Sequence, residues 1–124
     1  MPAEVRKKLT FPSRLRFALA GIAHALRSEQ NLRIQTLALL VVLVALLVLR
    51  PAPIWWALVV LASSSVLCAE LFNTAIEHLA DHLHPEIHPQ IRIVKDCAAA
   101  AVLICSIGAV GVAIALAIEL CRHL

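Results

Sequence analysis

Four polar residues recur along one predicted helix at spacings that place them on a single face. They are Glu70, Asn73, Glu77 and Asp81. The intervals i, i+3, i+7 and i+11, at about 100° per residue, put the four side chains within an arc of roughly 80°. The set begins where an apolar block, 54–69, ends, and it continues into polar sequence. We call these four residues the carboxylate ladder, because they lead acidic groups from an apolar to a polar environment.

A second charged cluster lies one short connection further along the chain. Lys95 and Asp96, preceded by Arg92, come directly before another apolar block. Taken alone, Lys95 could end a membrane helix by extending its ammonium to the surface, and Asp96 could cap the helix N-terminus. The carboxylate ladder beside them favours a functional interpretation of both residues.

Acids, an amide and an ammonium in this arrangement favour phosphoryl transfer. Magnesium prefers oxygen ligands and is often held by one or two carboxylates together with substrate phosphates. A lysine supplies positive charge to those phosphates, and a nearby carboxylate can take a hydroxyl proton from the acceptor. The three glycines, Gly21, Gly108 and Gly111, match neither of the glycine-rich nucleotide-binding motifs. A soluble-type nucleotide-binding fold is therefore excluded.

The elements that must position these residues are membrane helices. Of the 124 residues, 61% are hydrophobic, far above the usual share in soluble domains, and they gather in blocks at 34–49, 54–69 and 97–118. About 20 apolar residues cross a bilayer core, so the third block spans outright and the first two do so by extending into polar flanks. We expect a single all-α integral membrane domain over 1–124. Its predicted long helices are 32–49, 54–83 and 91–120.

A basic N-terminal arm, 1–30, sets the expected orientation. Apolar residues between 13 and 28 recur at three- and four-residue intervals opposite basic ones, which predicts an amphipathic helix lying in the membrane surface. By the positive-inside rule the N-terminus and the connection 82–95 face the cytoplasm. Glu29 lies at headgroup depth between this helix and the first span, where an acid is expected to meet a cation. Because ionisable groups within membrane segments tend to mark function, the active site is expected at the cytoplasmic face.

The other polar and small residues indicate packing rather than chemistry. Small residues along 97–118 let helix backbones approach closely, which predicts a homo-oligomer. The four cysteines show neither zinc-site spacing nor a disulfide framework. We expect His78, His82 and His84 to make hydrogen bonds at the membrane surface rather than bind a metal. No nucleic-acid partner is expected.

Three stretches of the chain resemble the bacterial diacylglycerol kinase and undecaprenol kinase family. They read ELFNTAIEHLAD at 70–81, VKDCAAAAV at 94–102 and SEQNLR at 28–33, and the three-span layout extends the resemblance over essentially the whole chain. The resemblance implies a homotrimer in the bacterial inner membrane, with active sites between subunits, that uses ATP and Mg²⁺. It implies phosphorylation of diacylglycerol to phosphatidic acid as first choice, with undecaprenol as the alternative acceptor.

The resemblance also implies roles for matching positions. Glu70 is expected to be the catalytic base that activates the lipid hydroxyl, whereas Asp81 matches an acidic position without an assigned role. Metal is expected at Glu29 and Glu77, with Asn73 as the amide that supports this site. The expected nucleotide-binding residues are Glu29, Glu77, Glu86, His88, Lys95 and Asp96. The expected lipid-binding residues are Glu70, Arg33 and Ala99.

Several positions depart from the diacylglycerol kinase pattern. Phe17 replaces a tyrosine that contacts nucleotide, Thr10 replaces an arginine, and Gln35 replaces an acid. Arg14 or Arg16 could supply the missing arginine in a shifted register. Arg33 is left with two interpretations, an ion pair with an acid or with a lipid phosphate.

Two other classes of function fit parts of the pattern. A proton-coupled transporter would use the acids of the carboxylate ladder as a relay, and a relay should cross the whole membrane. The halves of the three spans that lie away from the cytoplasmic face carry no charged residue, so the carboxylate ladder stops about half way. A non-catalytic membrane subunit would use the polar face for packing alone, and would tolerate glutamine at Glu70 and Glu77.

Overall fold

The computed structural model describes residues 2–124 as a chain of helices, so the first residue of the predicted arm 1–30 lies outside the described residues. The elements in chain order are α1 (Ala3–Lys7), α2 (Phe11–Ser28), α3 (Gln30–Leu49), α4 (Pro53–Leu83) and α5 (Pro89–Arg122). The chain is all-helical across this part, as expected from the sequence.

Three of these helices are long and apolar enough to cross a membrane. The mean hydropathy of the best window is 2.6 in α3, 1.8 in α4 and 2.7 in α5, and at most 17% of any such window is buried inside the chain. Large apolar side chains therefore point outward, which a bilayer tolerates and water does not. At about 1.5 Å per residue, α4 is about 46 Å long and exceeds the hydrocarbon thickness. Part of α4 must therefore extend beyond the membrane core.

The helix ends follow from local sequence. Arg50 closes α3 in the left-handed conformation, with φ of 48°, and its N–H donates to the Leu46 carbonyl over 2.9 Å. Proline occupies the first position of both α4 and α5, where its missing N–H costs no helical hydrogen bond. His88 caps α5 by accepting from the Gln90 N–H. Asp96 therefore lies inside the helix, and the alternative that it caps an N-terminus is wrong.

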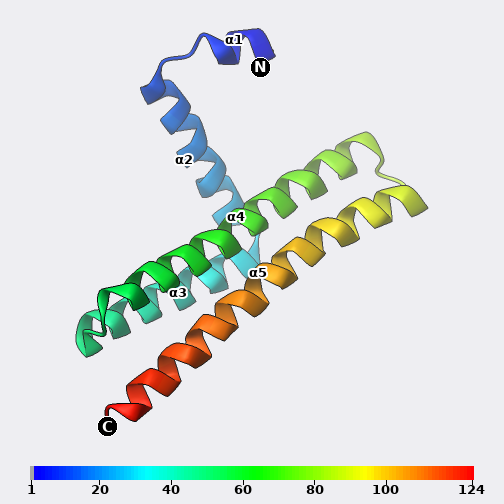
Figure 1. Ribbon diagram of the computed structural model, residues 1–124. Coiled ribbons are helices and arrows are strands. Elements are labelled where there is room, and N and C mark those ends of the chain that lie inside the picture. Colours follow the sequence, from blue (N-terminus) through cyan, green and yellow to red (C-terminus); the bar gives the residue numbers. More distant parts are fainter. Residues whose placement is uncertain (1) are drawn as a thin grey trace.

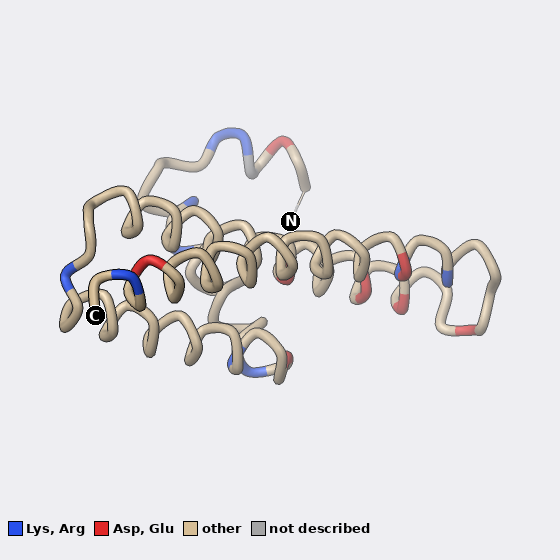
Figure 2. Tube along the Cα trace, turned by 60° about the horizontal axis from the view of Figure 1, so that its bottom comes forward, with Lys and Arg blue, Asp and Glu red and all other residues tan. Residues whose placement is uncertain are grey.

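The long helices are arranged around α4. Figure 1 shows α4 and α5 running antiparallel, α3 behind α4, and α2 leaving the others at a steep angle. A small core of Leu46, Val59 and Leu116 joins α3, α4 and α5, with Trp55 and Trp56 packed against it. This core lies toward the α3–α4 turn, at the end away from the carboxylate ladder. The charged residues at the other end of α4 and α5 cluster near the connection between these helices (Figure 2).

Candidate functional site

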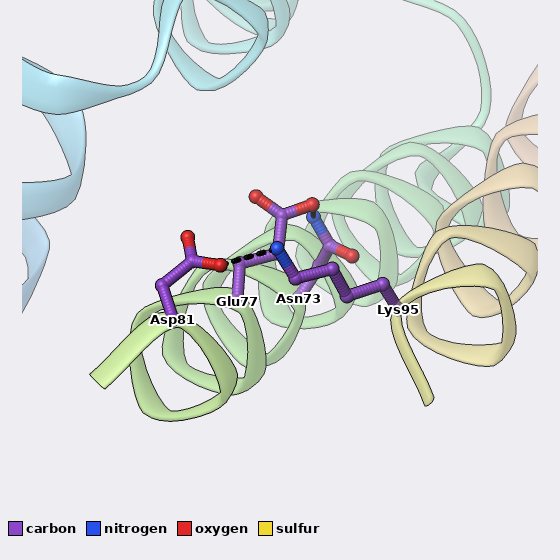
Figure 3. A network of polar contacts seen from close by, with 4 residues as sticks. All are labelled: Asn73, Glu77, Asp81 and Lys95. Carbon is purple, nitrogen blue, oxygen red and sulfur yellow. Dashed lines mark hydrogen bonds and ion pairs between the residues drawn. The ribbon is translucent and has the colours of Figure 1, made fainter. Parts of the chain in front are cut away.

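The carboxylate ladder lies on α4 with a gradient of exposure. Glu70 is buried, with 5% of its surface exposed, Asn73 and Glu77 are half-buried, and Asp81 is exposed. Figure 3 shows Asn73, Glu77 and Asp81 gathered on one side of α4. The helical spacing thus places these side chains on one side of α4, and the order of burial follows the order in the sequence.

The deepest acid is bonded to a residue that the sequence did not assign to the site. Gln35 of α3 donates from Nε2 to Glu70 Oε1 over 2.7 Å. Because an ionised carboxylate can only accept hydrogen bonds, a buried one needs donors from neighbouring elements. The sequence signalled Gln35 only as a departure from the family pattern, since the contact joins residues 35 positions apart.

The middle of the ladder offers oxygen atoms suited to a hard cation. Asn73 donates from Nδ2 to Glu77 Oε1 over 3.2 Å, which leaves the amide oxygen Oδ1 buried without a partner among the described residues. The amide thus turns its N–H side toward Glu77, so the carboxylate of Glu77 is the group of this pair that could hold Mg²⁺, alongside water and substrate phosphates. This carboxylate fits the implied magnesium ion.

Lys95 bridges the two charged clusters. Its ammonium, on α5, forms an ion pair with Asp81 of α4 (Figure 3). Asp96 instead pairs with Arg92 one helical turn away, at 3.9 Å. The antiparallel pairing of α4 and α5 therefore places an ammonium beside the exposed end of the carboxylate ladder, and gives Asp81 a partner that the sequence left unassigned.

Asp81→Asn is expected to change the free energy of unfolding by no more than about 1 kcal/mol. The reason is exposure, because 63% of the Asp81 side chain and 35% of the Lys95 side chain are accessible, so water screens the pair. Thermal unfolding in one detergent measures the effect, with Asp96→Asn as the matched change in an ion pair within one helix. A much larger loss for Asp81→Asn alone would mean that this pair holds α4 against α5.

The junction of α2 and α3 presents Glu29 and uses Arg33 structurally. Glu29 is half-buried in extended backbone between the two helices, and its side chain makes no capping hydrogen bond. Arg33 donates from Nη1 to the carbonyl oxygens of Leu26 and Arg27, over 3.0 and 2.8 Å. A cation at a helix C-terminus satisfies carbonyls that lack helical partners. In the structure Arg33 therefore caps α2, an interpretation that neither sequence alternative included.

The other predicted residues lie around the α4–α5 connection or on open helix surface. Glu86 and His88 are exposed in the connection, and Ala99 is exposed on α5. The His24 and His78 rings meet edge to face, with centroids 5.5 Å apart, and so join α2 to α4.

The basic candidates on α2 differ in their contacts. Arg14 donates to the Lys7 carbonyl over 3.2 Å, whereas Thr10 lies beside Ser13 at the start of the helix. Arg16 and Phe17 are exposed.

The described part of the chain holds the site residues in separate small groups. No three His, Cys, Asp or Glu side chains within residues 2–124 converge closely enough to hold a metal ion. The groups are the Gln35–Glu70 pair, the Asn73–Glu77 pair, the Asp81–Lys95 pair and the junction at Glu29. A site that uses one or two carboxylates and substrate phosphates as ligands needs no larger cluster.

Known proteins match most of this chain. The profile of the prokaryotic diacylglycerol kinase family matches residues 16–117, which include every group named above. A diacylglycerol kinase of Synechocystis sp. is 38% identical over 96 residues, which are 77% of this chain and 55% of that relative. An undecaprenol kinase of Bacillus subtilis is 33% identical over 84 residues, 68% of each protein. The match thus spans about half the length of the first relative and about two thirds of the second.

Proposed function

The chain belongs to the prokaryotic diacylglycerol kinase family, and from that premise we propose that it transfers the γ-phosphoryl group of ATP to a membrane lipid alcohol. Diacylglycerol is the first choice of acceptor, with phosphatidic acid as the product. The single observation that carries the proposal is the burial of Glu70 at the apolar end of the carboxylate ladder. A base at that depth suits an acceptor that arrives through the bilayer.

A groove that begins at Gln35, the hydrogen-bond partner of Glu70, supports a lipid acceptor. It has a volume of about 500 Å³ and lies between α3, α4 and α5, starting at Gln35 and running toward Leu49 and Leu120. Its walls are almost entirely aliphatic, and such a lining favours an acyl or prenyl chain over a polar substrate. Because Gln35 bonds to Glu70, a chain in this groove would bring its polar end close to the base.

The residues divide the proposed reaction between two ends of the carboxylate ladder. The acceptor hydroxyl gives its proton to Glu70 while its oxygen forms a bond to the γ-phosphorus, and the bond to the bridging β–γ oxygen breaks to release ADP. Lys95 supplies positive charge to the phosphates at the exposed end of the carboxylate ladder. Glu77 and Glu29 would hold Mg²⁺, which neutralises phosphate charge when bound, and Asn73 supports Glu77 through its hydrogen bond.

We expect purified protein in detergent or bicelles, with Mg²⁺ and labelled ATP, to label a lipid alcohol. Diacylglycerol and undecaprenol are assayed in parallel, and the acceptor with the higher kcat/KM is the preferred substrate. Protein heated beyond unfolding is the control for transfer without enzyme. If neither acceptor gains label across the magnesium range, the kinase proposal fails.

Undecaprenol is the second candidate acceptor. The observation in its favour is the similarity to a relative named undecaprenol kinase over two thirds of each chain. The groove suits a prenyl chain as well as an acyl chain, since both are recognised through apolar contact. The parallel assay decides between them.

The proposed assembly is a homotrimer in the bacterial inner membrane with the N-terminus and the site at the cytoplasmic face. The exposure of large apolar and small side chains along α5 supports contacts with other copies or with lipid. The separation of the site residues into small groups within one chain supports an active site completed between subunits. A proton-coupled transporter fits less well, because residues 34–49 and 54–69 carry no charge.

A further inference from the structure

Gln35 forms the contact between α3 and the deepest acid of α4. Its Nε2 lies 2.7 Å from Glu70 Oε1, a short distance for a hydrogen bond between an amide and a carboxylate. Glu70 is buried, so water competes little for the same oxygen. The bond joins two helices that contact each other over only part of their length. It therefore fixes the Glu70 side chain relative to α3 as well as α4.

The hydrogen bond from Gln35 gives the two oxygens of the Glu70 carboxylate different environments. Oε1 accepts from Gln35, whereas Oε2 accepts no hydrogen bond from the part of the chain that the structure describes. An ionised carboxylate has room for further donors on each oxygen. Oε2 is thus the oxygen left for a substrate hydroxyl, and its direction is set once Oε1 is held.

The other end of the Gln35 amide has no competing role. Its oxygen, Oε1, is buried and lacks a partner among residues 2–124. Glu70 is thus the group that determines which way this amide faces, because the carboxylate requires the N–H side.

We propose that Gln35 is a positioning residue, which holds the Glu70 carboxylate so that Oε2 faces the acceptor hydroxyl at the end of the apolar groove. The proposal rests on the proposed function, because it assumes that Glu70 is the base. Gln35 itself exchanges no proton with the substrate. Its contribution is the orientation of Glu70, and misplacement of a reacting group by about 1 Å can lower a rate about a hundredfold.

The test compares Gln35→Leu with Gln35→His in the full-length protein. Leucine has a similar volume and no donor, so we expect kcat with the lipid acceptor to fall about tenfold to a hundredfold, the range for loss of a hydrogen bond to a charged group. The KM for ATP is expected to stay near the wild-type value, because Gln35 donates its hydrogen bond to Glu70 and not to any residue proposed to bind nucleotide. Neutral histidine carries one N–H donor and one acceptor, so Gln35→His is expected to restore much of the lost kcat.

Thr36→Val is the matched control. Thr36 neighbours Gln35 on α3, is half-buried, and donates its hydroxyl to the Leu32 carbonyl within its own helix over 2.8 Å. We expect this isosteric change to leave kcat and both KM values near wild type. Thermal unfolding of all variants shows whether a loss of activity follows a loss of structure.

Three outcomes would overturn the proposal. Gln35→Leu with unchanged kcat would show that the bond does not position the base. A folded Gln35→His protein with no more activity than Gln35→Leu would show that a donor is not what matters, and where Gln35→Leu unfolds, a folded Gln35→His protein whose kcat is as low as that expected for Gln35→Leu would show the same. Equal losses in kcat and in ATP affinity would indicate general damage to the fold. An inactive wild-type protein would instead refute the proposed function, so the two failures are distinguishable.

Discussion

Glu70→Gln is expected to lower kcat for lipid phosphorylation by about 10²–10⁴-fold, the usual contribution of a positioned general base. The substitution keeps the size and shape of the side chain, and the new amide oxygen can still accept the hydrogen bond from Gln35. It removes the ability to take up a proton. Because Glu70 is buried at the apolar end of the carboxylate ladder, replacing a carboxylate with a neutral amide also avoids leaving an unpaired charge.

Glu119→Gln provides the matched control for this experiment. Glu119 lies near the C-terminal end of α5, where its carboxylate contacts His123 over 3.1 Å. Because α4 and α5 are antiparallel (Figure 1), this end of α5 is far from the carboxylate ladder on α4. Initial rates at saturating ATP and Mg²⁺ should match wild type for Glu119→Gln and collapse for Glu70→Gln. Retention of more than about a tenth of wild-type kcat by Glu70→Gln would contradict its assignment as the base.

The parts of the site that lie on one helix could be predicted from sequence. The i, i+3, i+7 and i+11 spacing sets the shared face of Glu70, Asn73, Glu77 and Asp81 whatever the rest of the chain does. The order of burial also follows from sequence, since the apolar block ends at Glu70. The face on which a helical residue lies depends only on its spacing from its neighbours in the sequence, and periodicity reports that spacing.

Contacts between helices could not be read from the same pattern. The pairing of Lys95 with Asp81 rather than with a neighbouring group depends on the register of α4 against α5, which the 84–88 connection sets through its conformation. Gln35 contacts Glu70 because α3 packs on α4. No spacing rule in the sequence predicts how two helices pack. The departure of Gln35 from the family pattern was the available signal, and it indicated a difference without indicating a contact.

The alternative that Asp96 caps α5 shows how a local rule can mislead. Lys95 and Asp96 stand directly before an apolar block, which resembles the start of a membrane helix with an acidic cap. The structure begins α5 at Pro89, so both residues have helical neighbours on each side. Hydropathy marks where a helix enters the bilayer, whereas proline and the His88 cap mark where the helix itself begins. Functional groups at a membrane surface lie between these two points.

Glu77→Gln is expected to weaken metal and nucleotide binding more than it slows the transfer step. Glu77 lies two helical turns from Glu70, is half-buried, and has one oxygen held by the Asn73 amide. The new side chain can still accept that hydrogen bond, but it brings no negative charge to a cation. We expect the Mg²⁺ concentration for half-maximal activity and the KM for ATP to rise by at least about tenfold.

Direct binding separates this effect from catalysis. Mn²⁺ binding in the presence of a non-hydrolysable ATP analogue, followed by electron paramagnetic resonance, should weaken in Glu77→Gln and remain near wild type in Glu70→Gln. The two substitutions are the same chemical change at two depths of one helix face, so any difference between them arises from position. Equal losses of nucleotide affinity would contradict the division of roles, because the buried and half-buried acids would then act as one ligand set. A loss confined to Glu77→Gln would place the phosphates at the half-buried middle of the carboxylate ladder and leave its buried end to the acceptor lipid.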